Sequence, residues 1–177
     1  MYWTDWGNVP SIVVAGMDGS LPFPIIDTGL NWPNGLALDQ GTSRLYWVDA
    51  HSDIIETCNL DGGDRRVIKS DGIRHPFSMD IFADTLYWSD WTAHQIQSCN
   101  KFTGENHKTI HTATRDQING VAVFHAAAQP KNRVNHCRNK PCSHICVLTP
   151  SQSFRCLCPV GMVIDGDRRT CKGRSVM

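Results

Sequence analysis

The sequence has no excess of charge of either sign and no long apolar run. Lys plus Arg and Asp plus Glu each number 17 among 177 residues, so the formal net charge is zero with His neutral. Such a balance gives no strong field to attract nucleic acid or a membrane surface. The longest apolar stretches, at 12–15 and 120–124, are far shorter than the roughly 18 residues that a membrane-spanning helix needs. We therefore expect no nucleic-acid partner and no direct membrane insertion by this segment.

Common catalytic motifs and a secretory leader are also absent. The sequence contains no GxSxG, HExxH or phosphate-binding loop, so we expect a non-catalytic chain without a cofactor. The motif Tyr-Trp-Thr-Asp at 2–5 follows Met1 directly, where a signal peptide would carry a basic region and an apolar one. We expect the natural protein to start further upstream, with this chain as a piece of it.

Cysteine is scarce over most of the chain and dense near its end. Only Cys58 and Cys99 precede the last 41 residues. The other six are Cys137, Cys142, Cys146, Cys156, Cys158 and Cys171. A dense even set indicates a disulfide framework and an oxidising compartment, although six cysteines allow 15 pairings. The alternative is a zinc site using the Cys-Ser-His-Ile-Cys stretch at 142–146, which would leave other cysteines unexplained.

The sequence repeats with a period near 40 residues. Its motif is Tyr2-Trp3-Thr4-Asp5, Tyr46-Trp47-Val48-Asp49 and Tyr87-Trp88-Ser89-Asp90. These copies start 44 and then 41 residues apart, which indicates a solenoid, a propeller or another array. The segments 33–39, 76–81 and 119–123 also recur in register, and so do 65–68 and 107–110.

The local pattern within each repeat favours strands. Apolar residues alternate with polar ones, and Gly19 and Gly62, each preceded by Asp, suit the positive φ of tight hairpin turns. Four short strands per repeat are typical of a propeller blade, and a closed propeller has four to eight blades. We therefore predict an all-β chain that contains about three blades of a larger ring.

The predicted domains follow from this count. We assign 1–125 to the C-terminal half of a propeller that is cut inside a blade at residue 2. A last strand at 118–124 would be the first strand of a further blade. A linker at 126–136, a small disulfide-rich module at 137–172 and a tail at 173–177 complete the chain.

The motifs together resemble the low-density-lipoprotein receptor family, especially its large receptor-related members. The resemblance is carried by the three motif copies, by PNGLALD at 33–39 and INGVAVFH at 118–125, and by the cysteine spacing after 136. It implies a six-bladed YWTD propeller followed by an EGF-like module. The chain departs from the family pattern in having three motif copies and no cysteine-rich ligand-binding modules, membrane anchor or cytoplasmic tail.

The resemblance also implies a cysteine pairing and a function. The pairing is Cys137–Cys146, Cys142–Cys156 and Cys158–Cys171. Calcium is not expected before the first of these cysteines, because 132–136 lacks a carboxylate. The function implied is that of a type I endocytic receptor, on the extracellular or lumenal side of the plasma membrane and endosomes. Its partners would be secreted or cell-surface protein ligands, or other modules of the same receptor, with release at low pH. Alternatives are a Wnt-type signalling co-receptor and a calcium-dependent propeller hydrolase.

Roles follow for individual motif residues. We expect the aromatic pairs to pack between blades and the aspartates to accept hydrogen bonds from a neighbouring strand or blade. The pairs are Tyr2 and Trp3, Tyr46 and Trp47, and Tyr87 and Trp88; the aspartates are Asp5, Asp49 and Asp90. Trp6 and Trp91 should also pack, whereas packing and ligand binding both stay open for Trp32.

Two further sets of residues are left with two interpretations each. Cys58 and Cys99 occupy matching places in adjacent repeats, which allows either a bridge or two separate buried thiols. Histidine gains charge between neutral and endosomal pH. The candidate pH-switch residues are His75, His94, His125 and His136, with ordinary surface histidines as the alternative.

Overall fold

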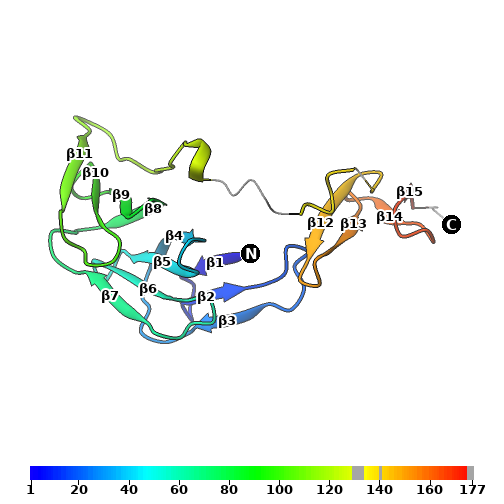
Figure 1. Cartoon of the computed structure of the whole chain (residues 1–177), viewed down its shortest axis with the longest axis horizontal. Coiled ribbons are helices and arrows are strands. Elements are labelled where there is room, and N and C mark those ends of the chain that lie inside the picture. The colour runs from blue at the N-terminus through cyan, green and yellow to red at the C-terminus, as the bar shows by residue number, and fades with distance from the viewer. Residues whose placement is uncertain (129–133, 140, 175–177) are drawn as a thin grey trace. The chain divides into compact units, whose positions relative to one another are not determined.

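The computed structural model describes residues 1–128, 134–139 and 141–174 (Figure 1). These residues form strands, turns and one short 3-10 segment, η1 (Ala126–Ala128). Within the described part no helix is long and apolar enough to cross a membrane. Contacts divide the chain into two compact units: the larger comprises 2–13 and 24–129, and the smaller comprises residue 1, 14–23 and 130–177.

The larger unit is built from antiparallel sheets whose strands follow one another in chain order (Figure 1). The first sheet is β1 (Tyr2–Asp5), β2 (Ser11–Val14) and β3 (Phe23–Ile26); the second is β4 (Pro33–Asp39), β5 (Arg44–Asp49), β6 (Ile54–Asn59) and β7 (Arg66–Lys69); the third is β8 (Pro76–Phe82), β9 (Thr85–Asp90), β10 (Gln95–Asn100) and β11 (Lys108–Thr112). The second and third sheets have four strands each, as propeller blades do, and the first has three. The predicted all-β class, with about three blades, is confirmed.

Two glycines allow neighbouring blades to approach closely. A Cβ at Gly35 in β4 would lie 2.5 Å from the amide nitrogen of Met79 in β8, so the inner strands can come together only because residue 35 has no side chain. Gly62 takes a φ of +90° in the β6–β7 turn, and a Cβ there would lie 2.2 Å from the Ile25 carbonyl oxygen of β3. Both contacts set how tightly one blade packs on the next.

The core of this unit lies between the blades, in two clusters. One contains Trp47, Leu45 and Cys58 with residues of the first sheet such as Ile12. The other contains Tyr46 and Trp88 among its members. Tyr46 and Trp47 are adjacent in β5 and therefore face opposite sides of the sheet. The motif pair thus packs one blade against both of its neighbours, as expected for buried aromatic side chains.

The predicted strand at 118–124 is wrong as a strand assignment. The segment carries no strand, although the N–H groups of Val121 and Val123 donate to Ser78 Oγ at 3.2 Å and Asp80 Oδ2 at 2.7 Å. It therefore lies beside β8. A strand requires main-chain pairing with a neighbouring strand. The described residues contain no further strand that could pair with 118–124 in an additional blade. The predicted linker 126–136 and tail 173–177 fall partly outside the described residues.

The smaller unit contains two short hairpins and three disulfides. Its strands are β12 (Ile145–Thr149), β13 (Ser153–Leu157), β14 (Met162–Ile164) and β15 (Cys171–Gly173), which pair as β12–β13 and β14–β15. The disulfides are Cys137–Cys146, Cys142–Cys156 and Cys158–Cys171, with Cα–Cα distances of 5.7, 5.4 and 5.6 Å. This is the pairing that the resemblance implies. All six of these cysteines are in disulfides, so none of them is free to bind zinc at 142–146.

Cys58 and Cys99 form no bridge in the structure. Both thiols are free and buried, and the possible bridge between them is therefore corrected. The physical reason is that Cys58 packs in the cluster around Trp47, whereas Cys99 packs in the cluster around Trp88. Burial raises the pKa of each thiol to about 11. The two residues thus behave as small apolar groups with little thiolate character.

Candidate protein-binding surface

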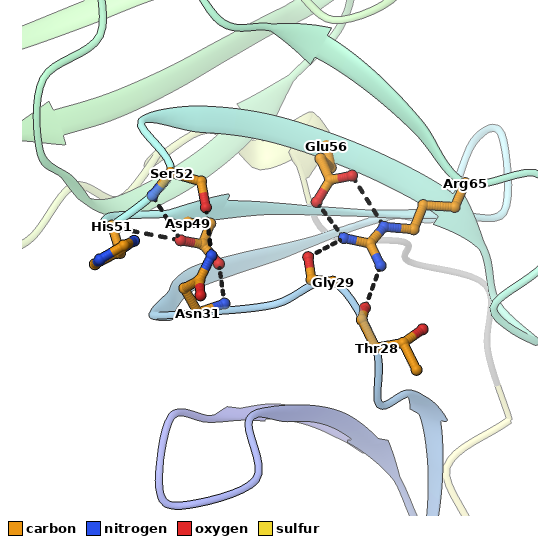
Figure 2. A network of polar contacts seen from close by, with 8 residues as sticks. All are labelled: Thr28, Gly29, Asn31, Asp49, His51, Ser52, Glu56 and Arg65. Carbon is orange, nitrogen blue, oxygen red and sulfur yellow. Dashed lines mark hydrogen bonds and ion pairs between the residues drawn. The ribbon is translucent and has the colours of Figure 1, made fainter.

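Asp49 of the second motif copy holds two loops in place. It is fully buried, and its carboxylate accepts hydrogen bonds from the backbone N–H groups of Asn31, His51 and Ser52 at 2.8, 3.1 and 3.0 Å (Figure 2). Asn31 precedes the inner strand β4, whereas His51 and Ser52 follow β5. The motif aspartate therefore joins the entrance of its own sheet to the turn after the motif.

Asp90 repeats this arrangement in the next blade. Its carboxylate accepts from the N–H groups of Arg74, His75 and Ala93 at 2.9, 3.4 and 2.8 Å. Asp5 in the first copy accepts from the Gly7 N–H at 2.9 Å. Buried carboxylates with several N–H donors fix backbone positions strongly, so Asp49 and Asp90 determine where the aromatic side chains of their loops lie, whereas Asp5 is exposed and accepts one such bond.

Those loops and strand ends present a group of aromatic rings, which we call the aromatic surface: Trp6, Trp32, His75, Phe77 and Trp91. With Asn34 they line a hollow of about 260 Å³. Trp91 stacks on Phe77 and on His75, with centroid distances of 4.0 and 5.4 Å. Trp32 lies 6.2 Å from His75 and 5.0 Å from His51. Aromatic rings held rigidly on loops are typical anchors of protein interfaces.

Exposure separates the three tryptophans of this surface. Trp6 is 61% exposed and Trp32 is 44% exposed, whereas Trp91 is half-buried under its two stacking partners. The packing prediction for Trp6 is therefore wrong, because its indole lines the hollow. The sequence leaves both packing and ligand binding open for Trp32, and its exposure makes it a surface residue.

Arg65 ties the second blade to the loop that leads into it (Figure 2). Its guanidinium donates to both oxygens of Glu56 at 2.9 and 2.7 Å, and to the carbonyl oxygens of Thr28 and Gly29 at 2.6 and 2.7 Å. It also lies 5.3 Å over the ring of Trp47. One planar side chain thus satisfies four acceptors, which only arginine geometry permits.

His107 takes the corresponding place in the third blade and was not among the predicted histidines. Its ring lies 5.5 Å from Trp88, and a Cβ at Gly72 would lie 2.9 Å from its Cε1. Desolvation there lowers the pKa of His107; Lys69 lowers it further and Asp71 opposes them. The register of 65–68 with 107–110 is the signal that could have identified this position.

The four predicted histidines lie in different surroundings. His75 belongs to the aromatic surface. His94 Nδ1 is 3.3 Å from the Asp116 carbonyl oxygen, and His125 accepts from the Ala127 N–H at 3.1 Å. His136 is exposed in a turn. The structure therefore brings one of the four to the candidate site.

Acidification is expected to lower the free energy of unfolding slightly through His107. Its pKa is lowered in the folded chain, so below about pH 6.5 the unfolded chain takes up the proton first and stability falls. Because the residue is exposed, we expect a loss of at most about 0.5 kcal/mol from this site. Urea unfolding of the wild type and His107→Gln at pH 7.4 and 5.5 measures it. An equal pH dependence of the two proteins would contradict the assignment, and His111→Gln, an exposed position in β11, is the control.

Among the described residues, no group of three or more His, Cys, Asp or Glu side chains is placed to share a metal ion.

The comparisons with known proteins define the class of the domains first. The description "Low-density lipoprotein receptor repeat class B" matches residues 1–40 and 43–79, and "EGF-like domain" matches 137–168. A chain of a solved nidogen/laminin complex is similar to 67% of this chain, covering 46% of its own, with 32% identity and a TM-score of 0.62. A luciferin-regenerating enzyme, 16% identical with a TM-score of 0.56, covers 67% of this chain and 43% of its own. That likeness shows the fold alone.

Two receptors then define the family. The chain is 42% identical to the vitellogenin receptor of Solenopsis invicta over 97% of its length, and 42% identical to the vitellogenin receptor Yl of Drosophila melanogaster over 97%. With its class B repeats and EGF-like domain, it belongs to the low-density-lipoprotein receptor family. The chain spans about a tenth of these relatives, 10% and 9% of their respective lengths.

Proposed function

We propose that this chain is a non-catalytic, ligand-binding segment of a cell-surface endocytic receptor. The support is its similarity to two vitellogenin receptors over nearly its whole length. Its place would be the extracellular or lumenal side of the plasma membrane and endosomes, within a type I membrane receptor. Its partners would be secreted or cell-surface proteins, or other modules of the same receptor.

The observation that carries this proposal is the aromatic surface. Exposed and half-buried rings on one hollow, whose loops are held in two of the three blades by the buried Asp49 and Asp90, can bury a large area on a partner at little cost in side-chain entropy. A similar fold occurs in a chain of the nidogen/laminin complex, which supports a protein-binding role for this fold. The predicted domain division, with repeats in 1–125 and the EGF-like module in 137–172, is retained as part of the proposal.

Release at low pH is the finer part of the proposal. His75 lies between Trp32 and Trp91 in the aromatic surface. Protonation would place a positive charge where a partner's apolar side chain is bound, and that charge would be costly to bury. We therefore assign the pH-sensing role to His75 before the other three candidates.

Vitellogenin of Solenopsis invicta is the test ligand, because a relative of this chain is named as its receptor. Replacing Trp32 or Trp91 with alanine is expected to weaken its binding to this chain by about tenfold or more, as for interface anchors. Surface plasmon resonance at pH 7.4 measures the dissociation constants. Ester hydrolysis is assayed in parallel, to test the alternative of a propeller hydrolase. Val67→Ala is the matched control, because Val67 is 53% exposed and lies outside the hollow. To test release, the titration is repeated at pH 5.5 with the wild type and with His75→Gln. The wild type is expected to lose affinity at this pH and the variant to keep it. Unchanged binding by both tryptophan variants would overturn the role of the aromatic surface.

A further inference from the structure

Charge is distributed unevenly between the two parts of this neutral chain. Within 137–174 there are seven basic residues and two acidic ones, which gives 7 − 2 = +5. The rest of the chain has 17 − 7 = 10 basic and 17 − 2 = 15 acidic residues, which gives −5. The segment that contains the EGF-like module is therefore basic, although the composition of the whole chain conceals it.

The module also contains a groove, of about 960 Å³. Apolar side chains line part of it, including Phe154, Leu157 and Met162. Arg155, Arg168 and Arg169 line it as well. We call these arginines and the apolar lining residues of β13 and β14 the basic groove. Such a lining suits a ligand that carries both apolar groups and negative charge.

Most of the positive charge in the groove is not neutralised within the module. All three arginines are exposed. In the described part of the chain no ion pair involves Arg168 or Arg169, and the Arg169 guanidinium lies 5.9 Å over the Phe154 ring. Arg155 is 3.7 Å from Asp18 of the same unit and its side chain stays 61% exposed.

The single carboxylate of the groove is already occupied. Asp167 accepts from the N–H groups of Arg169 and Thr170 and from the Thr170 hydroxyl, at 2.8, 2.9 and 2.6 Å. These bonds hold the turn that presents Arg168, whose φ of 57° fixes an uncommon backbone conformation. Arg168 and Arg169 are thus positioned by the module's own turn and Arg155 by strand β13, while their guanidinium groups stay exposed.

We propose that the basic groove binds an acidic peptide segment of a protein partner, with carboxylates on the arginines and apolar side chains against Phe154 and its neighbours. Arginine forms bidentate bonds with carboxylates and stacks on flat groups. A sulfated glycan would use the arginines and leave the apolar lining without a partner. The peptide therefore fits the observed lining better. This site is separate from the aromatic surface and does not rest on the function proposed for it.

The test is a selection of random 12-residue peptides, displayed on phage, against the immobilised 1–177 chain. Enriched peptides are synthesised and titrated by fluorescence anisotropy against the wild type and the double variant Arg155→Gln/Arg169→Gln. Arg138→Gln/Arg174→Gln is the matched control, because it removes the same charge from exposed positions of the module outside the groove. Mass spectrometry of the disulfides and the circular dichroism spectrum verify that each variant is folded.

The expected result is enrichment of peptides that combine Asp or Glu with apolar residues. Their affinity should fall at least tenfold in the groove variant and less than threefold in the control variant. The proposal is overturned if the selected peptides are not acidic, or if both variants weaken binding equally. It is also overturned if a heparin dodecasaccharide binds the wild type while no peptide is enriched.

Discussion

Replacing Lys101 with methionine is expected to lower the free energy of unfolding by about 3–5 kcal/mol, as when one partner of a buried ion pair is removed. Lys101 follows β10 and reaches the preceding blade, where its Nζ lies 2.8 Å from Asp39 Oδ2 at the end of β4. It also donates to the Ala83 carbonyl oxygen at 2.6 Å. Both charged side chains are less than 10% exposed, so methionine would leave a buried carboxylate without a cation.

The pH dependence of this variant distinguishes a lost ion pair from lost packing. Burial would by itself raise the pKa of Asp39, but the bonds from Lys101 and Thr42 outweigh it and the pKa is lowered. Without Lys101 the burial effect should dominate and raise the pKa above the value in the unfolded chain. The folded variant would then bind the proton more tightly, so its deficit should shrink as the pH falls from 7 to 5. Urea unfolding across this range measures it.

Lys69→Met is the matched control for this prediction. Lys69 is as buried as Lys101, but its partner Asp71 is 89% exposed. Removing Lys69 leaves a carboxylate that water can solvate, so we expect a loss of less than about 1 kcal/mol. Equal losses for the two lysine variants would contradict the importance of the buried carboxylate.

The sequence predicted the blades because each strand carries its own alternating pattern, and the repeat places the strands in register. It did not predict the state of 118–124. Main-chain pairing depends on a neighbouring strand, and this segment instead binds Ser78 and Asp80 through side-chain oxygens. The alternating pattern lies in the sequence of the segment itself, but a strand forms only where a neighbouring strand pairs with it.

The candidate sites depended even more on three-dimensional contacts. Trp6, Trp32 and Trp91 are spread over 86 positions of the sequence, and their approach to one hollow follows from the closeness of the blades. The basic groove was missed because the composition of the whole chain is neutral. Counting charge for the predicted module alone would have revealed it.

Replacing Trp88 with alanine is expected to cost about 3–5 kcal/mol of the free energy of unfolding, as for other buried tryptophans. Trp88 lies in β9, is fully buried, and belongs to the cluster between the second and third blades. Its Nε1 has no hydrogen-bond partner among the described residues, so the indole acts through its apolar surface. Trp88→Phe should therefore cost no more than about 2 kcal/mol, because an aromatic ring remains and an unpaired buried N–H is removed.

Trp3 provides the matched control, since it holds the same motif position in the first copy but is 36% exposed. No described sheet covers the side of β1 that corresponds to the covered side of β9, so Trp3→Ala should cost less than about 2 kcal/mol. Chemical denaturation of the three variants measures both differences. If Trp3→Ala and Trp88→Ala destabilised the chain equally, the motif tryptophan would act within its own sheet. If the loss follows burial, its contribution arises from the packing of one blade against the next.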